Sequence, residues 1–139
     1  MSDNSVMDQQ KPATDPYRLF SPITLAFLGD AVFELKVRAH LIRSGNIVAK
    51  KLHKKCVDYV RAAAQAESVR GIWSMLTEEE QEILRWGRNS NSAHIPKNAD
   101  PIEYRYATGL EALFGYLFLH EKHERIDEIF DAVVKSKNS

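Results

Sequence analysis

Cysteine is almost missing from this chain of 139 residues, because Cys56 is the only one. A single thiol can form neither an internal disulfide nor a cysteine zinc site, which agrees with a cytoplasmic location. No stretch approaches the roughly 18 uninterrupted apolar residues that a membrane span requires. The N-terminal segment "MSDNSVMDQQKPATDP" also lacks the basic start and apolar run of a signal peptide. We therefore expect a cytoplasmic protein that does not contact a membrane.

Net charge is absent as well, since 19 basic residues balance 19 acidic residues. The charges are nevertheless spread unevenly. Residues 43–97 hold ten basic and six acidic side chains, whereas residues 98–139 hold five and eight. A local basic surface can bind nucleic acid on a neutral protein, because the local field sets the contacts with phosphate. The middle third of the chain is therefore the candidate nucleic-acid surface.

No segment alternates apolar and polar residues with period two, so the sequence predicts no strands. Three helix starts are marked by capping residues: Ser21 before a proline, Thr77 with Glu80 as a capping box, and Asp100 before another proline. We predict an all-α protein, with a flexible tail at residues 1–16 and a single domain at residues 17–139. The expected helical regions are 22–43, 48–76 (with a bend), 78–88, 101–120 and 124–135.

Two carboxylates fall on helical faces that are otherwise mostly apolar, namely Asp30 and Glu111. Glycines lie close to each of them, with Gly29 on the first helix and Gly109 and Gly115 on the second. Glycine lowers helix stability, and close approach of another backbone is the usual compensation. We expect the two helices to pack tightly, with both carboxylates buried and facing each other, where Mg²⁺ or Mn²⁺ would relieve their repulsion. Hydrogen bonds to backbone groups or to an arginine would explain buried carboxylates equally well, and spacing alone does not decide.

Two segments carry a family resemblance. "FLGDAVFEL" (Phe27 to Leu35) closely resembles the signature segment of the ribonuclease III family, and "LEALFGYLFL" (Leu110 to Leu119) is similar to its second metal-ligand segment. The longer stretch "YRYATGLEALFGYLFL", the preceding "RNSNS...PKN" loop and the lack of a double-stranded-RNA-binding domain resemble the compact Mini-III branch. The resemblance extends from about Pro16 to Lys135.

The resemblance implies a homodimeric, all-helical endonuclease with a ribonuclease III-like fold. It would use Mg²⁺, for which Mn²⁺ can substitute, to hydrolyse double-stranded RNA to 5′-phosphate and 3′-hydroxyl ends. The implied natural substrate is a precursor of large-subunit (23S-type) ribosomal RNA, and a ribosomal protein that presents this RNA is a further expected partner. The catalytic and metal-binding roles of the family fall on Asp30 and Glu111.

The chain departs from the full-length members of the family at three positions. Ile23, Ala26 and Thr108 stand where those enzymes carry acidic residues. Such losses are typical of the Mini-III branch and do not by themselves imply a loss of activity. With fewer protein oxygens available, a bound cation would keep more water ligands.

Double-stranded RNA is recognised mainly by its shape and its phosphates. The candidate contacts are basic or amide side chains of the middle third: Lys50, Lys51, Lys54, Lys55, Arg85, Arg88, Asn89 and Lys97. Taken alone, "KKLHKK" is more typical of a solvated helix face, and only its occurrence beside the nuclease segments favours RNA. The segment "RNSNSAHIPKN" is compatible with an ordinary connecting loop, but its length and hydrogen-bonding side chains favour a loop that probes RNA.

Two other functions are compatible with the sequence. One is a catalytically silent domain that binds RNA or a ribosomal particle, and the other is a helical dimerisation module without RNA affinity. A silent domain has no physical reason to keep two costly carboxylates on apolar helix faces. The presence of both Asp30 and Glu111 therefore favours the enzyme.

Overall fold

The computed structural model describes residues 15–45, 47–90 and 95–138, and every regular element within these ranges is a helix. In chain order the elements are η1 (Pro16–Leu19), α3 (Pro22–Arg43), α4 (Ala49–Val60), α5 (Ala62–Ile72), η2 (Trp73–Met75), α6 (Glu78–Arg88), α7 (Pro101–Leu119) and α8 (His123–Asn138). The prediction of an all-α fold is confirmed. None of the helices described here is long and apolar enough to cross a membrane.

The helix starts predicted from capping residues are confirmed. Ser21 Oγ accepts a hydrogen bond of 3.1 Å from the backbone N–H of Thr24 at the start of α3. Thr77 and Glu80 exchange hydrogen bonds of 3.1 and 2.9 Å in a complete capping box before α6. The Asp100 side chain accepts from two backbone N–H groups at the start of α7. These local interactions fix where each helix begins, independently of the core.

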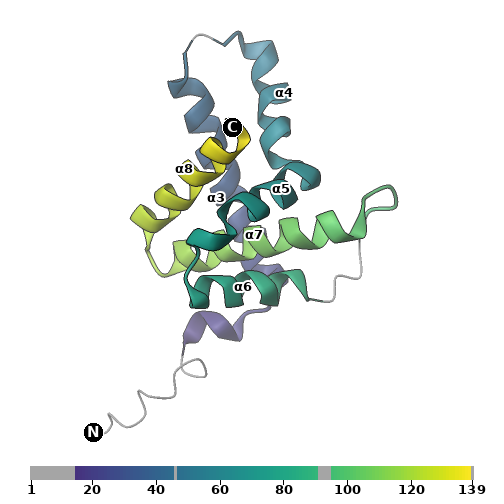
Figure 1. Ribbon diagram of the computed structural model, residues 1–139, viewed down its shortest axis with the longest axis vertical. Helices are drawn as coiled ribbons and strands as arrows, with labels where there is room; N and C mark the ends of the chain where they lie inside the picture. The colour runs from purple at the N-terminus through teal and green to yellow at the C-terminus, as the bar shows by residue number, and fades with distance from the viewer. Residues whose placement is uncertain (1–14, 46, 91–94, 139) are drawn as a thin grey trace, which may run out of the picture.

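The expected bend in the region 48–76 is a break between α4 and α5. Arg61 stands between the two helices in an extended conformation, with φ −66° and ψ 153°. Of the residues in α4, only Cys56 and Tyr59 are buried, so most of this helix projects beyond the core. In Figure 1, α4 lies at the upper end of the long axis.

The core is arranged around α7. This helix crosses the molecule in front of α3 in Figure 1, and it also packs against α5, α6 and α8. Its residues from Ala107 to Leu117 are all buried except Glu111, which is half-buried. The most extensive of its contacts is with α3, where Phe33 and Phe114 meet edge to face with ring centroids 5.3 Å apart. A carboxylic acid thus sits in the middle of the most enclosed helix of the protein.

Polar contacts tie Asp15, the first described residue, and the start of the last helix to this core. Asp15 accepts a hydrogen bond of 2.6 Å from the Tyr116 hydroxyl of α7, and its carboxylate lies 3.1 Å from His120 Nε2. Arg125 of α8 makes two hydrogen bonds of 2.8 Å to the buried carboxylate of Glu80 on α6. Burial acts to raise the pKa of Glu80, but the hydrogen bonds and the charge of Arg125, together with the hydrogen bonds of Thr77, outweigh it and the pKa is lowered. Of the expected tail at residues 1–16, the described chain includes only Asp15 and Pro16.

Candidate active site

The site is built on a crossing of two helices in backbone contact. A Cβ atom placed on Gly29 of α3 would lie 1.6 Å from the carbonyl oxygen of Glu111, and one on Gly115 of α7 would lie 2.0 Å from that of Leu25. Only glycine permits such an approach. Asp30 follows Gly29 directly, and its side chain is a hydrogen-bond partner of Glu111. The predicted juxtaposition of the two carboxyl groups is therefore confirmed.

The expected role of the third glycine is wrong. Gly109 does not contribute to the crossing with α3, because it faces α6 instead. A Cβ atom there would lie 2.6 Å from the carbonyl oxygen of Leu84. Residues 109 and 115 are six positions apart, so they point to different sides of α7. Two close approaches, one on each side, fix α7 between α3 and α6.

The expected burial of both carboxylates is only partly right. Glu111 is half-buried, but Asp30 is exposed in this chain. The prediction assumed that all the apolar neighbours of Asp30 face the core. Ala26 and Phe33 do, but Phe27, one turn before Asp30, has 84% of its surface exposed. Asp30 therefore lies at the edge of the core, beside an apolar side chain that has no partner among the described residues.

The electrostatics of the pair come from burial and like charge. Burial raises the pKa of Glu111, the negative charge of Asp30 and its hydrogen bond raise it further, and the pKa reaches about 8. Because the ordinary value is 4.5, ionisation of Glu111 opposes folding increasingly as the pH rises from 4.5 towards 8. Two adjacent carboxyl groups that repel each other when ionised are the oxygen donors that a hard divalent cation attracts. The donor set of Asp30 and Glu111 therefore fits Mg²⁺ or Mn²⁺.

The donor set is small. Within the part of the chain that the structure describes, no group of three or more acidic, histidine or cysteine side chains could hold a metal ion. This agrees with the apolar and hydroxyl residues at positions 23, 26 and 108. A cation bound by two carboxylates would complete its coordination with water and with oxygens of the substrate.

A third polar side chain at this site was missed by the sequence reasoning. Gln65 of α5 is only 1% exposed, and its amide lies near enough to the Glu111 carboxyl to lower the pKa of that group. Its Nε2 atom nevertheless has no hydrogen-bond partner of good geometry among the described residues. One signal was available: Gln65 shares a helical stripe with Val69 and Ile72, both buried. A polar residue on an apolar stripe is the same anomaly that identified Asp30 and Glu111.

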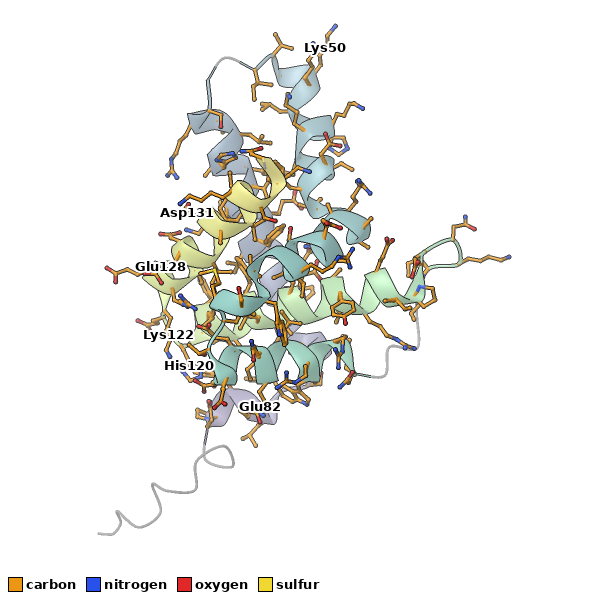
Figure 2. The ribbon with its side chains drawn as sticks, in the orientation of Figure 1. Lys50, Glu82, His120, Lys122, Glu128 and Asp131 are labelled. Carbon is orange, nitrogen blue, oxygen red and sulfur yellow. The ribbon has the colours of Figure 1, made fainter. Side chains whose placement is uncertain are left out.

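The candidate RNA contacts form two groups that lie apart. Lys50, Lys51, Lys54 and Lys55 are all exposed on α4. The second group consists of Arg85 and Arg88 near the end of α6, Asn89 at its C-cap, and Lys97 before α7. Figure 2 shows Lys50 at the opposite end of the long axis from Glu82 of α6. Positions 91–94 of the expected RNA-probing loop lie outside the described residues.

Two arginines of the second group stack on aromatic rings. The Arg85 guanidinium lies 5.5 Å from the centroid of Trp73, and that of Arg88 lies 5.5 Å from the centroid of Tyr106. Such stacking holds the planar cation at the surface without neutralising its charge. The end of α6 therefore presents fixed positive charges to a ligand.

Comparison with known proteins now identifies the family. The family model of the Ribonuclease III domain matches residues 23–122, which include the whole crossing of α3 and α7. The chain belongs to the ribonuclease III family. As a ribonuclease III-type protein it is an endoribonuclease, and its substrate is RNA.

Several relatives of this ribonuclease III protein are named Mini-ribonuclease 3. The one from Thermoanaerobacter is 48% identical over 83% of this chain and 81% of the relative, and the one from Brevibacillus brevis is 46% identical over 88% and 91%. The Staphylococcus aureus protein is 33% identical over 95% and 98%. A crystal structure of a protein from Fusobacterium nucleatum has 34% identity and a TM-score of 0.77, covering 88% of this chain and 99% of that one. The resemblance to the Mini-III branch is confirmed.

Proposed function

We propose that this endoribonuclease hydrolyses double-stranded RNA in a Mg²⁺-dependent reaction that leaves 5′-phosphate and 3′-hydroxyl ends, and that Mn²⁺ can substitute for Mg²⁺. One observation supports this most strongly. Contact between the backbones at Gly29 and Gly115 places Asp30 and Glu111 side by side at the crossing of α3 and α7. We assign the metal-binding and catalytic roles to these two residues.

The protein supplies position and charge to the reaction. When bound, the cation would stabilise negative charge on the reacting phosphate and make water a better nucleophile. Asp30 is exposed and can meet a phosphate at the surface, whereas Glu111 is half-buried on a helix packed on several sides. Phosphoryl transfer requires little covalent work from side chains, so a rigid pair of carboxylates is sufficient machinery.

The shape of a double-stranded RNA fits the placement of the basic side chains. A duplex is an extended rod with two rims of phosphates, and it is recognised by shape more than by sequence. The helix α4, which carries the exposed lysines, and the helix α6, which carries the arginines, lie apart along the long axis (Figure 1). We propose that they contact the same duplex at separate places, on either side of the carboxylates.

A cleavage assay with matched substrates tests this function. Purified protein is incubated with a long double-stranded RNA and, separately, with one strand of the same sequence, in Mg²⁺ or in EDTA. We expect fragments only from the duplex with Mg²⁺, and degradation of these fragments by an exonuclease that requires a 5′-phosphate. The duplex could instead stay intact in Mg²⁺ although the protein binds it and circular dichroism shows that the protein is folded. That result would favour the catalytically silent RNA-binding domain.

We also propose the natural substrate that the family resemblance implies, a precursor of large-subunit (23S-type) ribosomal RNA. A ribosomal protein that presents the RNA would be a second partner. The same assay applies to a precursor transcript that retains its flanking sequences, with and without purified ribosomal proteins. Cleavage of a control duplex at the same rate as the precursor under all these conditions would contradict the proposal.

A second copy of the chain is the partner that we propose for the unpaired face of α3. Ile23, Phe27 and Leu35 follow one another on this face with 42%, 84% and 63% of their surfaces exposed. Exposed apolar side chains in a row are typical of an interface. Asp30 lies one turn from Phe27, so a homodimer formed here would enclose the edge of each active site.

The change Phe27→Glu tests the homodimer. We expect wild-type protein to have twice the mass of the chain in light scattering after gel filtration, and the variant to have the mass of one chain, because a charge would be buried in the interface. The control is Ile102→Glu, since Ile102 is 65% exposed but lies on the first turn of α7. A wild-type monomer at micromolar concentration would contradict the proposal, as would a dimeric Phe27→Glu variant.

A further inference from the structure

Gln65 is a polar side chain that the fold itself does not require. It lies on α5 among four alanines in the sequence "AAAQA", and its neighbours Ala66 and Val69 are buried. An apolar side chain of the same length would fill this position without burying an amide. Buried polar groups nearly always have hydrogen-bond partners, and one without a partner destabilises the folded state. The Nε2 donor of Gln65 has no such partner in the described structure.

The surroundings of Gln65 contain an acceptor for this donor. The helix α5 packs directly on α7, and the amide of Gln65 lies near enough to the carboxyl group of Glu111 to lower its pKa. Gln65 approaches this carboxyl from α5, whereas Asp30 approaches it from α3. Glu111 is therefore flanked by a negative oxygen donor on one helix and a neutral hydrogen-bond donor on another.

We propose that Gln65 is a positioning residue that donates a hydrogen bond from Nε2 to the Glu111 carboxylate when the site holds its divalent cation. This inference rests on the proposed function, because it assumes that Glu111 is a ligand of the cation. A carboxylate oxygen that accepts from Gln65 is fixed in orientation, and its second oxygen is left for the cation. Partners that orient metal ligands in this way commonly change metal affinity by tenfold or more.

Gln65→Met is the direct test, since methionine has the same length and no amide. We expect the variant to be at least as stable as wild type in EDTA, because no unsatisfied donor is buried. We expect its dissociation constant for Mn²⁺, followed by electron paramagnetic resonance of the free ion, to rise about tenfold. The Mg²⁺ concentration for half-maximal cleavage should rise by a similar factor.

The control is Ser68→Ala on the same helix. Ser68 is also buried, but its hydroxyl donates to the carbonyl of Ala64, within α5. We expect this variant to bind Mn²⁺ as wild type does. If Gln65→Met also binds Mn²⁺ like wild type, the proposed role of Gln65 is wrong. If wild type itself neither binds Mn²⁺ nor cuts RNA, it is the proposed function that fails, and the role of Gln65 fails with it.

A measurement on wild-type protein covers the case in which Gln65→Met does not fold. The side-chain amide protons of Gln65 are followed by nuclear magnetic resonance during a titration with Mg²⁺. A new hydrogen bond to a carboxylate should shift one of these protons downfield and slow its exchange with water. An amide resonance that stays in place when Mg²⁺ saturates the protein would overturn the proposal.

Discussion

Replacing Asp30 with asparagine should lower the rate of RNA cleavage by roughly a thousandfold, while above pH 8 and without metal the folded protein remains at least as stable as wild type. A cation that stabilises charge contributes several kcal/mol to the transition state, and each 1.4 kcal/mol corresponds to about a factor of ten in rate. Asparagine keeps the shape of the side chain but loses the charge that attracts the cation. The rate is measured on double-stranded RNA with saturating Mg²⁺.

The stability of the folded protein should not fall with the rate, for an electrostatic reason. The charge of Asp30 is one of the causes that raise the pKa of Glu111 to about 8, so above this pH, where Glu111 is ionised, removal of that charge relieves a repulsion within the folded state. We expect the thermal midpoint of Asp30→Asn, measured in EDTA above pH 8, to equal or exceed that of wild type. A control is Asp131→Asn, the same chemical change on an exposed residue of α8 away from the crossing. Asp30→Asn protein that cuts as fast as Asp131→Asn protein would show that Asp30 has been assigned wrongly.

Gly29→Ala should damage both the fold and the activity. A methyl group at this position would lie 1.6 Å from a backbone oxygen of α7, which cannot rotate away as a side chain can. Relief requires separation of α3 and α7, the most extensive helix contact of the protein. We expect a loss of about 3 kcal/mol or more in the free energy of unfolding, the upper end for overpacked sites. Urea denaturation, with cleavage measured at low temperature, gives both quantities.

The same substitution elsewhere provides the control. Alanine at a helical glycine normally raises stability by up to about 1 kcal/mol, so the sign of the effect is informative. Gly71→Ala places its methyl group against the side chain of Ser136, in the last turns of α8. We expect a much smaller loss there, because that end of the chain can shift. Equal stabilities for the two variants would contradict the backbone contact between α3 and α7.

Local chemistry explains which parts of the fold were predictable. The starts of α3, α6 and α7 depend on a capping side chain within three residues of each helix, so the sequence predicts them directly. The break at Arg61 carries no glycine or proline, and it was expected only as a bend of undefined position. Its location depends on how α4 and α5 pack against other helices. Packing of this kind is not encoded in any short segment.

The candidate site, like the fold, was predictable from the sequence only in part. Asp30 and Glu111 were recognisable because each is a charge on an apolar stripe with a glycine nearby, and their contact was expected for that reason. The exposure of Asp30 was not predictable from periodicity, because an apolar stripe is the same pattern whether it faces the core or another molecule. Gln65 could have been found by the same test. Neutral amides attract less attention than carboxylates, although burial without a partner is costly for both.

The basic residues illustrate a further limit of reading along the chain. The lysines of α4 and the arginines of α6 stand in one basic region of the sequence, which suggested a single surface. The folded chain places α4 at the upper end of its long axis and α6 toward the lower end (Figure 1). Two basic residues that are near each other in the sequence need not be near each other in the folded protein. Their positions in space depend on the path of the helices that connect them.

The helix α4 buries few residues, and this separates the proposed RNA-binding surface from the carboxylates of the candidate active site. This helix carries four exposed lysines, buries only Cys56 and Tyr59, and is divided from α5 by the extended residue Arg61. Its outer positions can therefore change with little effect on the crossing at Gly29 and Gly115. On the proposed function the α4 lysines contact the RNA, so libraries confined to the exposed face of α4 would vary the choice of RNA while the chemistry stays constant, and α4 is the natural target for engineering a nuclease with a new preference.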